Sequence, residues 1–265
     1  MRILLVIVFL VSASSVFAYD EVTLKNGQVI RGKIIKDDET GIVIEVTEGE
    51  MKLSQVLTRD QVANVSIEEP AEYSKAKELQ NRKEWLEAVQ AYQQVIEVYP
   101  KYKWAEAALF HKGECYERLK DWQKAKESYE RFLKDYPKSE FYLNAKTGLA
   151  YSLLMQNMHG EALKIYESML NAAKGEMVAQ VHYGIGEANL GQKKFDEALE
   201  QGYLKVVVLD YDFPDWVAKA MLKGAECFMY LGDIKRAAYY YEEVLKKYPD
   251  TGYAKEAKEK LKKGE

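Results

Sequence analysis

Cysteine, histidine and proline are scarce in this chain: it has two, three and five of them among 265 residues. A zinc site needs three or four protein ligands, so the sequence offers little material for one. His111 and Cys115 are four residues apart and could share a helix face, but no further Cys/His pair lies near them in the sequence. We therefore predict no metal site and no cofactor.

Motifs for catalysis are also missing. The sequence has no phosphate-cradling glycine loop and no nucleophile motif, and the glycines of GIGEANLG (residues 184–191) fall inside a predicted helix. The acid pair Asp37-Asp38 falls in a predicted hairpin turn, where solvated charge is the ordinary explanation. The chain is predicted not to be an enzyme. An enzyme with an unrecognised site stays open as a further hypothesis, which a metal held tightly by the purified protein would support.

No strong charge of either sign marks the chain, whose net charge is −4. Residues 19–69 carry eleven acids and six bases, which gives −5, whereas residues 70–265 carry thirty-one of each. Such a balance creates no general attraction to nucleic acid or to anionic lipid. No nucleic-acid partner is predicted from it.

The first eighteen residues, MRILLVIVFLVSASSVFA, combine a basic Arg2, an apolar run and a small-residue cleavage site after Ala18. This order is typical of a secretory signal peptide. The apolar run is shorter than the ~20 residues that span a bilayer, so no stable membrane insertion is predicted after cleavage. No cysteine follows Ala18, which argues against a bacterial lipid anchor there. The mature chain is predicted to be periplasmic or secreted.

An alanine recurs through the rest of the chain at a nearly constant interval. The spacings are 37, 37, 36 and 39 residues, a period that indicates a helical solenoid. The marker alanines are Ala88, Ala125, Ala162, Ala198 and Ala237. Each unit is predicted to be two amphipathic helices, because apolar residues recur three or four apart, and proline ends the second helix in several units.

This pattern resembles the tetratricopeptide repeat, in which a small residue, an aromatic, an alanine, a second aromatic and a proline recur at fixed slots. These slots hold Ala76, Leu79, Ala88, Tyr92 and Pro100 in the first unit; Gly113, Tyr116, Ala125, Tyr129 and Pro137 in the second; Ala150, Leu153, Ala162 and Tyr166 in the third; Gly186, Asn189, Ala198 and Gly202 in the fourth; and Ala225, Phe228, Ala237, Tyr241 and Pro249 in the fifth. The third unit lacks the proline, and the fourth has Gly202 where the aromatic belongs. The resemblance implies five stacked repeats over residues 70–250 and a capping helix over 251–265.

The repeat also decides how the two cysteines are interpreted. Cys115 and Cys227 occupy equivalent slots three units apart, and stacked helices are ~8–10 Å from one another. A disulfide needs Cα atoms within roughly 7 Å, so both are predicted to be free core residues. The period and the Tyr-Pro helix ends are also similar to the tetratricopeptide domains of the Tol-Pal-associated cell-division coordinator and of the outer-membrane barrel-assembly lipoprotein. The lipoprotein's lipidated cysteine and the coordinator's coiled coil are absent.

Residues 19–69 have a different pattern, in which Val, Ile and Thr alternate with polar residues. This period of two, interrupted by turn signals such as Asn26-Gly27, predicts five short strands at about 20–25, 28–37, 41–47, 50–56 and 63–68. Closure into a small barrel is expected, because it would remove exposed strand edges. The spacing of Leu24, Gly27, Gly32, Ile35 and Asp38 resembles the first motif of Sm-like barrels, where the second glycine lets a strand bend. The fold class is thus α+β by domain: a small five-stranded barrel, then an all-α solenoid.

In tetratricopeptide solenoids the first helix of each unit lines the concave face, where partner segments lie. The resemblance implies the following groove residues: Tyr73, Phe110, Glu114, Arg118, Tyr151, Met155, Tyr183, Glu187, Leu222, Met229 and Tyr230. Their composition is that of a binding hot spot, although about half are expected to be exposed and the others to pack on neighbouring helices. Lys and Asn, which chaperone-binding repeats use to grip a carboxylate, are not at these slots, so an apolar or amphipathic segment is expected.

Two functions from different classes remain. The leading hypothesis is a non-catalytic scaffold of the bacterial cell envelope, which binds other envelope proteins or peptide segments in the groove. The alternative is an RNA-binding regulator that uses the Sm-like barrel, although the RNA-contacting asparagine of that family would fall near Thr40 or Gly41. Whether the barrel binds a partner or caps the first repeat is left open.

Overall fold

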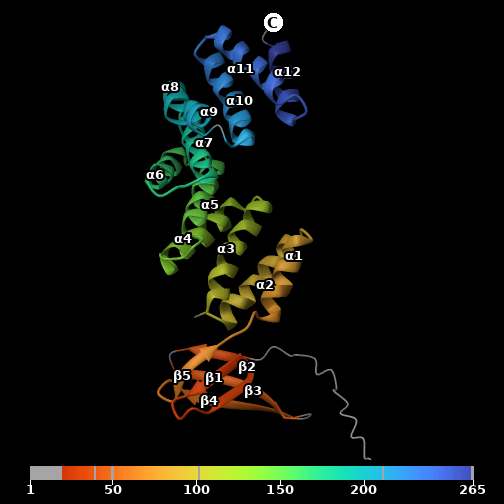
Figure 1. Cartoon of the computed structure of the whole chain (residues 1–265), viewed down its shortest axis with the longest axis vertical. Coiled ribbons are helices and arrows are strands. Elements are labelled where there is room, and N and C mark those ends of the chain that lie inside the picture. Colours follow the sequence, from red (N-terminus) through yellow and green to blue (C-terminus); the bar gives the residue numbers. More distant parts are fainter. Residues whose placement is uncertain (1–19, 39, 49–50, 101, 211, 264–265) are drawn as a thin grey trace, which may run out of the picture. The chain divides into compact units, whose positions relative to one another are not determined.

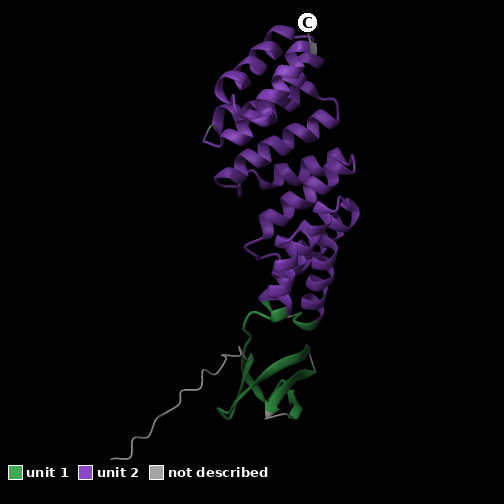
Figure 2. Ribbon diagram, turned by 90° about the vertical axis from the view of Figure 1, so that its right-hand side faces the viewer, with its two compact units in different colours: residues 1–71, 98–102 green, residues 72–97, 103–265 purple. Residues whose placement is uncertain are grey.

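The computed structural model describes residues 20–38, 40–48, 51–100, 102–210 and 212–263. It divides into two compact units (Figure 2): one contains the chain up to Ala71 together with Val98–Tyr102, and the other contains Glu72–Glu97 and the chain from Lys103 onward. The predicted signal peptide, residues 1–18, lies outside the described residues. None of the described helices is long and apolar enough to cross a membrane.

The first unit is built on a five-stranded antiparallel sheet (Figure 1), which confirms the predicted number of strands. The strands are β1 (Asp20–Leu24), β2 (Val29–Asp38), β3 (Gly41–Glu48), β4 (Met51–Thr58) and β5 (Val62–Ser66), in the spatial order β4-β3-β2-β1-β5. Asn26-Gly27 makes the first turn, with Gly27 at φ 85° and the Asn26 Oδ1 accepting from the Gln28 N–H. Alternate residues of these strands form a small apolar core: Val22, Ile30, Ile34, Ile42, Ile44 and Leu57.

β2 changes partner at a glycine. Its residues up to Gly32 pair with β1, and those from Lys33 onward pair with β3. A β-carbon at Gly32 would lie 2.3 Å from the carbonyl oxygen of Glu45, so only glycine permits this close approach. Closure into a barrel is not confirmed, because β4 and β5 end the strand order and the described residues form an open sheet.

Asp37 corrects the expectation of a solvated acid in a turn. It lies on β2 with 4% of its surface exposed, forms an ion pair with Arg59 and accepts a hydrogen bond from the Tyr102 hydroxyl. A buried carboxylate requires such partners, because desolvation without them is costly. Burial also raises the pKa of Tyr102 to about 12. The side chain is thus a structural part of the first unit.

The second unit consists of paired helices that follow one another along the chain (Figure 1). They are α1 (Ala71–Asn81), α2 (Trp85–Val98), α3 (Lys103–Arg118), α4 (Trp122–Asp135), α5 (Tyr142–Met155), α6 (His159–Met169), α7 (Glu176–Gly191), α8 (Phe195–Glu197), the π-helical η1 (Ala198–Tyr203), α9 (Leu204–Leu209), α10 (Pro214–Tyr230), α11 (Ile234–Lys247) and α12 (Gly252–Lys263). The five marker alanines are fully buried. Small side chains there let the two helices of a unit approach closely, as the repeat predicts.

In the fourth unit, a π-helical turn places an aromatic residue in the slot to which the sequence pattern assigned Gly202. The second helix of this unit has a π-helical turn, η1, which inserts one residue, so that Tyr203 lies five residues after Ala198 instead of four. Tyr203 is fully buried and takes the place assigned to Gly202. Gly202 instead packs against the backbone of Gly186, whose Cα would be 2.3 Å from a β-carbon there. The fourth unit therefore has a buried aromatic residue at this slot.

Candidate partner-binding groove

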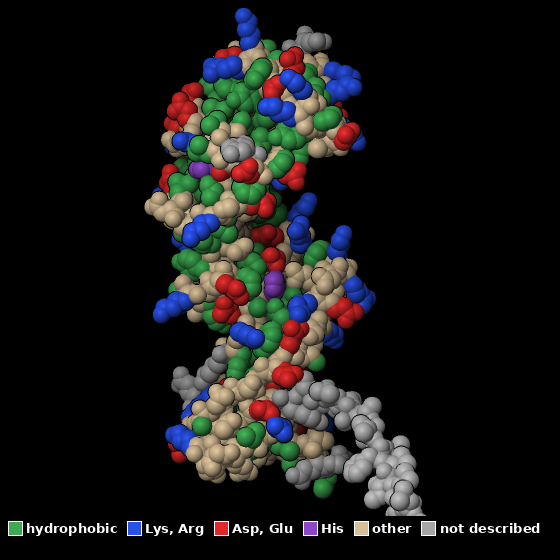
Figure 3. Space-filling model, in the orientation of Figure 1, with side chains coloured by type: hydrophobic (Ala, Val, Ile, Leu, Met, Phe, Trp, Pro, Cys, Tyr) green, Lys and Arg blue, Asp and Glu red, His purple; other side chains and the backbone are tan. Residues whose placement is uncertain are grey.

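A cavity of about 620 Å³ opens in the middle of the helical unit, on the face formed by α3, α5, α7 and α10. Figure 3 shows acidic side chains gathered in the hollow at this level of the repeats. The lining residues are Phe110, Glu114, Glu117, Tyr129, Asn144, Thr147, Gly148, Tyr151, Leu154, Met155, His159, Tyr166, Gln180, Tyr183, Gly184, Glu187, Trp216 and Lys219. They come from four consecutive repeats, so stacking of the repeats forms the site.

Tyrosines of the second helices form the floor of the cavity. Tyr129 of α4 lies between α3 and α5, and a β-carbon at Gly113 or Gly148 would lie 2.7 or 2.4 Å from its ring. Tyr166 of α6 packs in the same manner on Gly184 of α7. These glycines let each tyrosine reach past the first helices toward the concave face.

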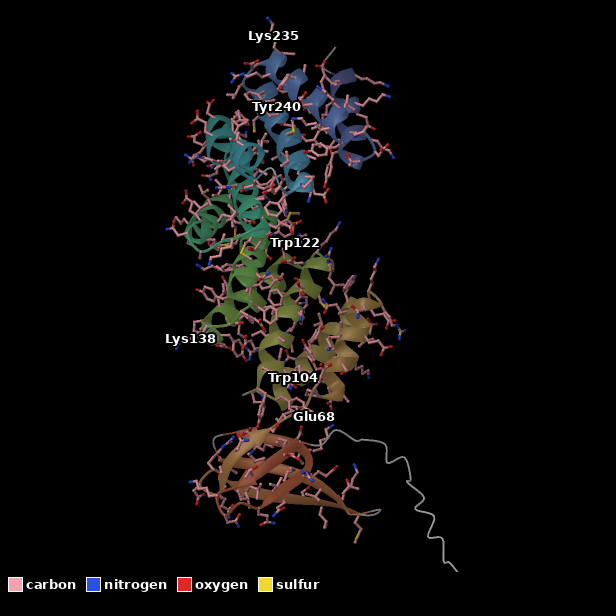
Figure 4. The ribbon with its side chains drawn as sticks, in the orientation of Figure 1. Glu68, Trp104, Trp122, Lys138, Lys235 and Tyr240 are labelled. Atoms are coloured by element: carbon pink, nitrogen blue, oxygen red, sulfur yellow. The ribbon has the colours of Figure 1, made fainter. Side chains whose placement is uncertain are left out.

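Exposed apolar side chains form the wall of the cavity on α5. Tyr151 and Met155 are 42% and 45% exposed and lie one helical turn apart. Trp122, the first residue of α4 and labelled in Figure 4, meets the Tyr151 ring edge-on, with centroids 5.6 Å apart. This contact supports the Tyr151 ring from one side and leaves the rest of it accessible.

Three carboxylates from two helices face this cavity. Burial, opposed by a hydrogen bond from Tyr129 and assisted by the charge of Glu114, raises the pKa of Glu117 to about 7. Glu187 accepts a hydrogen bond of 2.6 Å from the Tyr203 hydroxyl. Glu114 contacts the His111 ring nitrogen at 2.7 Å.

Six of the eleven predicted groove residues line this cavity. They are Phe110, Glu114, Tyr151, Met155, Tyr183 and Glu187. Phe110 is almost fully buried and stacks on Phe141, with ring centroids 4.9 Å apart, so it supports the wall more than it faces solvent. The six residues come from three repeats, α3, α5 and α7, as expected for a groove that crosses the first helices.

The other five predicted groove residues lie elsewhere. Tyr73 is buried against Tyr92 and Trp104. Leu222 of α10 is buried in the apolar core of the last repeats. Arg118, Met229 and Tyr230 are exposed but do not line the cavity. The Tyr230 ring stacks on Phe195 at 4.7 Å. The slots thus include residues on the helices that line the cavity, but the local packing decides which side chains reach it.

Sequence reasoning missed several lining residues. Glu117 follows Glu114 by three residues, a spacing that places both on one helix face, so this signal was available. Trp216 and Lys219 lie on α10, and the Lys219 ammonium is 4.4 Å from the Trp216 ring centroid. The floor tyrosines were assigned only a packing role. Their hydroxyls reach the cavity because the facing residues are glycines.

His159, His182 and the two cysteines are packing residues or line the cavity. His182 is mostly buried, and its Nδ1 lies 2.9 Å from an Asp210 carboxylate oxygen. His159 begins α6, packs over Gly191 and lines the cavity. Cys115 and Cys227 are buried free thiols, as predicted, and burial raises the pKa of each to about 12. Within the described part of the chain, no three His, Cys, Asp or Glu side chains are grouped to hold a metal ion.

Comparisons with known proteins agree with the fold of the helical unit. The family model of the tetratricopeptide repeat matches residues 73–102, 107–139 and 219–251. No curated protein matches the sequence significantly. Among solved structures, MamA from Desulfovibrio magneticus RS-1 is 20% identical with a TM-score of 0.58, covering 69% of this chain and 99% of that one.

A second similar structure is YrrB, described as a TPR protein with an unusual peptide-binding site. It is 19% identical with a TM-score of 0.53, covering 71% of this chain and 90% of YrrB. Another MamA structure is 18% identical, covers 74% and 99% of the two chains and has a TM-score of 0.55. At these identities the likeness is one of fold. Three of the units therefore match the tetratricopeptide repeat, and the helical region has the fold of such repeats.

Proposed function

We propose that this protein is a non-catalytic scaffold that binds a segment of a partner protein in the groove of its repeats. The observation that carries the proposal is the 620 Å³ cavity, which combines exposed Tyr151 and Met155 with polar groups from neighbouring repeats. Exposed aromatic and Met side chains around a concave site are typical of binding hot spots. The likeness in fold to YrrB, a protein described by its peptide-binding site, supports the same proposal.

We further propose that the scaffold works in the bacterial cell envelope, with other envelope proteins as partners. The support is the signal-peptide pattern of residues 1–18 and the similarity of the Tyr-Pro repeat to periplasmic tetratricopeptide domains. The sheet is proposed to be an Sm-like module used for assembly; the support is that β2 changes its pairing partner from β1 to β3 at Gly32, the second glycine of the resemblance. Cell fractionation tests the location: unprocessed full-length protein in the cytoplasm would instead favour the RNA-binding alternative.

The groove is tested by selecting displayed twelve-residue peptides on the immobilised full chain. The variant Tyr151→Asp/Met155→Asp should lower the affinity of the selected peptides tenfold or more, because it places charge where apolar contact is expected. Tyr239→Asp, at an exposed aromatic on α11 that does not line the cavity, is the matched control and should bind as wild type. Equal binding of the selected peptides to wild type and the groove variant, or no enrichment, overturns the proposal.

A further inference from the structure

Glu117 and Glu187 face the cavity without a basic partner in the part of the chain that the structure describes. Among the described residues, neither carboxylate is within 4.0 Å of a lysine, arginine or histidine nitrogen. Glu187 is supported by the Tyr203 hydroxyl and Glu117 by Tyr129, which are neutral donors. Carboxylates in a partly desolvated site normally have a positive partner, because desolvation otherwise disfavours the charged form.

The bases near the cavity act on these carboxylates only at longer range, Arg118 on Glu117 and Lys223 on Glu187. Lys219 lines the cavity but is held over the Trp216 ring. Arg118 is exposed and lies outside the lining. Lys223 interacts with Glu187 at longer range, but its ammonium is 2.9 Å from Glu226 instead.

The walls of the cavity suit a positive group. Tyr151, Tyr183 and Trp216 line it, and the faces of aromatic rings attract ammonium and guanidinium groups within about 6 Å. A cation in the cavity would therefore have both aromatic rings and carboxylates among the groups that line it. A metal ion fits less well, because no three ligating side chains in the described part of the chain are close enough together.

The protein itself shows this contact one repeat further on. Glu226 occupies the position of Glu187 in the next unit, each eleven residues before its marker alanine. The Lys260 ammonium of α12 lies 2.6 Å from one Glu226 oxygen, and that of Lys223 lies 2.9 Å from the other. At the end of the array, an amphipathic lysine-bearing helix thus neutralises the carboxylate that the middle repeats leave unpaired.

We propose that the cavity recognises a basic side chain, lysine or arginine, on the bound segment of a partner protein, between Glu117 of α3 and Glu187 of α7. The inference rests on the proposed function and specifies the chemistry of the partner. The segment would be amphipathic, with an apolar side against Tyr151 and Met155 and its basic residue directed at the carboxylates. In this respect it would resemble α12.

The recognition depends on pH, because a proton competes with the cation. Glu117 has a pKa of about 7 in the free protein, so it is partly protonated at neutral pH. The charged groups around it are Glu114 and Arg118 on α3, Glu187 on α7 and Lys219 on α10. The other titratable side chains that line the cavity are His159 on α6 and the tyrosines Tyr129, Tyr151, Tyr166 and Tyr183. A bound cation lowers the pKa of Glu117, so affinity rises from pH 6 to pH 8.

The test uses a defined probe and the full chain. N-acetyl-lysine methylamide and its arginine analogue are titrated at pH 8, and the ε-methyl resonance of Met155 is followed by NMR. N-acetyl-norleucine methylamide, which has the same carbon chain without the charge, is the reference. We expect a saturable shift at millimolar concentration for at least one basic probe and at least tenfold weaker binding of norleucine.

Variants separate the carboxylates from the rest of the groove. The double variant Glu117→Gln/Glu187→Gln keeps the size of both side chains and their ability to accept hydrogen bonds. It should weaken the binding of the basic probe tenfold or more. Glu167→Gln, at an exposed position of α6 outside the lining, should bind as wild type. Equal binding of the basic and norleucine probes, no saturation by either basic probe, or unchanged binding by the double variant overturns the inference. Selected peptides that depend on Tyr151 but not on a basic residue would overturn it too, while the proposed function stands.

Discussion

Glu187 and Glu226 occupy the same position of consecutive repeats but have opposite surroundings. Glu187 accepts a hydrogen bond from Tyr203 and faces the open cavity, whereas Glu226 is paired with two lysines. Burial raises the pKa of Glu226, but the hydrogen bonds from Lys260 and Lys223 outweigh this effect, so its pKa lies below the ordinary value. The same slot therefore serves structure at the end of the array and remains available for a partner in the middle.

The third and fourth units also differ from the other units in how well they follow the repeat pattern. The family model matches the first, second and fifth units but neither the third nor the fourth. The third lacks the closing proline, and the fourth contains the π turn η1. Much of the cavity is lined by α5 and α7 of these two units. Departures from a repeat are expected where a site is built, because the site needs side chains that stacking alone does not require.

The largest expected effect comes from filling a glycine under a floor tyrosine. A β-carbon at Gly184 would lie 2.4 Å from the buried Tyr166 ring, whereas one at Gly224 of α10 would be 3.6 Å from its nearest neighbour. Gly184→Ala should therefore lower the free energy of unfolding by about 3 kcal/mol. Gly224→Ala should be neutral or raise it by up to about 1 kcal/mol through helix propensity. Urea unfolding followed by circular dichroism measures both, and equal stability of the two variants would contradict this account.

The next prediction compares Glu117, which has no basic partner among the described residues, with Glu226, which is paired with two lysines. Glu117 has a folded-state pKa of about 7, above its ordinary value of 4.5, so the folded state binds more protons between these values and loses stability as pH rises. Glu117→Gln removes this penalty and should raise the free energy of unfolding by about 2 kcal/mol at pH 8, with little change at pH 4.

Glu226→Gln is the matched comparison. The lowered pKa of Glu226 means that its stabilising contribution is present above the unfolded pKa and is lost as pH falls through the folded pKa. The variant should therefore be less stable than wild type at pH 8, and the difference should shrink in acid. Thermal unfolding at pH 4, 6 and 8 measures both variants. A loss of stability at pH 8 in both would show that Glu117 is compensated like Glu226.

The repeated features were predictable from the sequence, and the local exceptions were not. The marker alanines identify the helix pairs because close packing demands a small residue in every unit. The π turn was missed because it moves the aromatic from Gly202 to Tyr203, which a fixed spacing cannot detect. Sheet closure is a long-range property, whereas alternation reports only one strand at a time. The burial of Asp37 was missed because its partner Tyr102 lies far along the chain.

The smallest effect concerns the turn between the two helices of each unit. Five equivalent residues have positive φ: Lys83, Lys120, Asn157 and Lys193 at 58–63°, and Gly232 at 78°. A side chain other than glycine costs about 1–2 kcal/mol in this region, and glycine loses about 0.5–1 kcal/mol more entropy on folding. Lys120→Gly should therefore raise the free energy of unfolding by about 0.5–1 kcal/mol.

The same slot gives the reverse change in the fifth unit. Gly232→Lys should lower the free energy of unfolding by a similar amount, and Asn157→Gly should change it least, because asparagine tolerates positive φ. A β-carbon at Gly232 meets no atom within 4 Å, so packing adds no further penalty and the backbone alone is measured. The urea concentration at the unfolding midpoint should be highest for Lys120→Gly, intermediate for Asn157→Gly and lowest for Gly232→Lys. Any other order would mean that neighbouring contacts, and not φ, determine the stability of these turns.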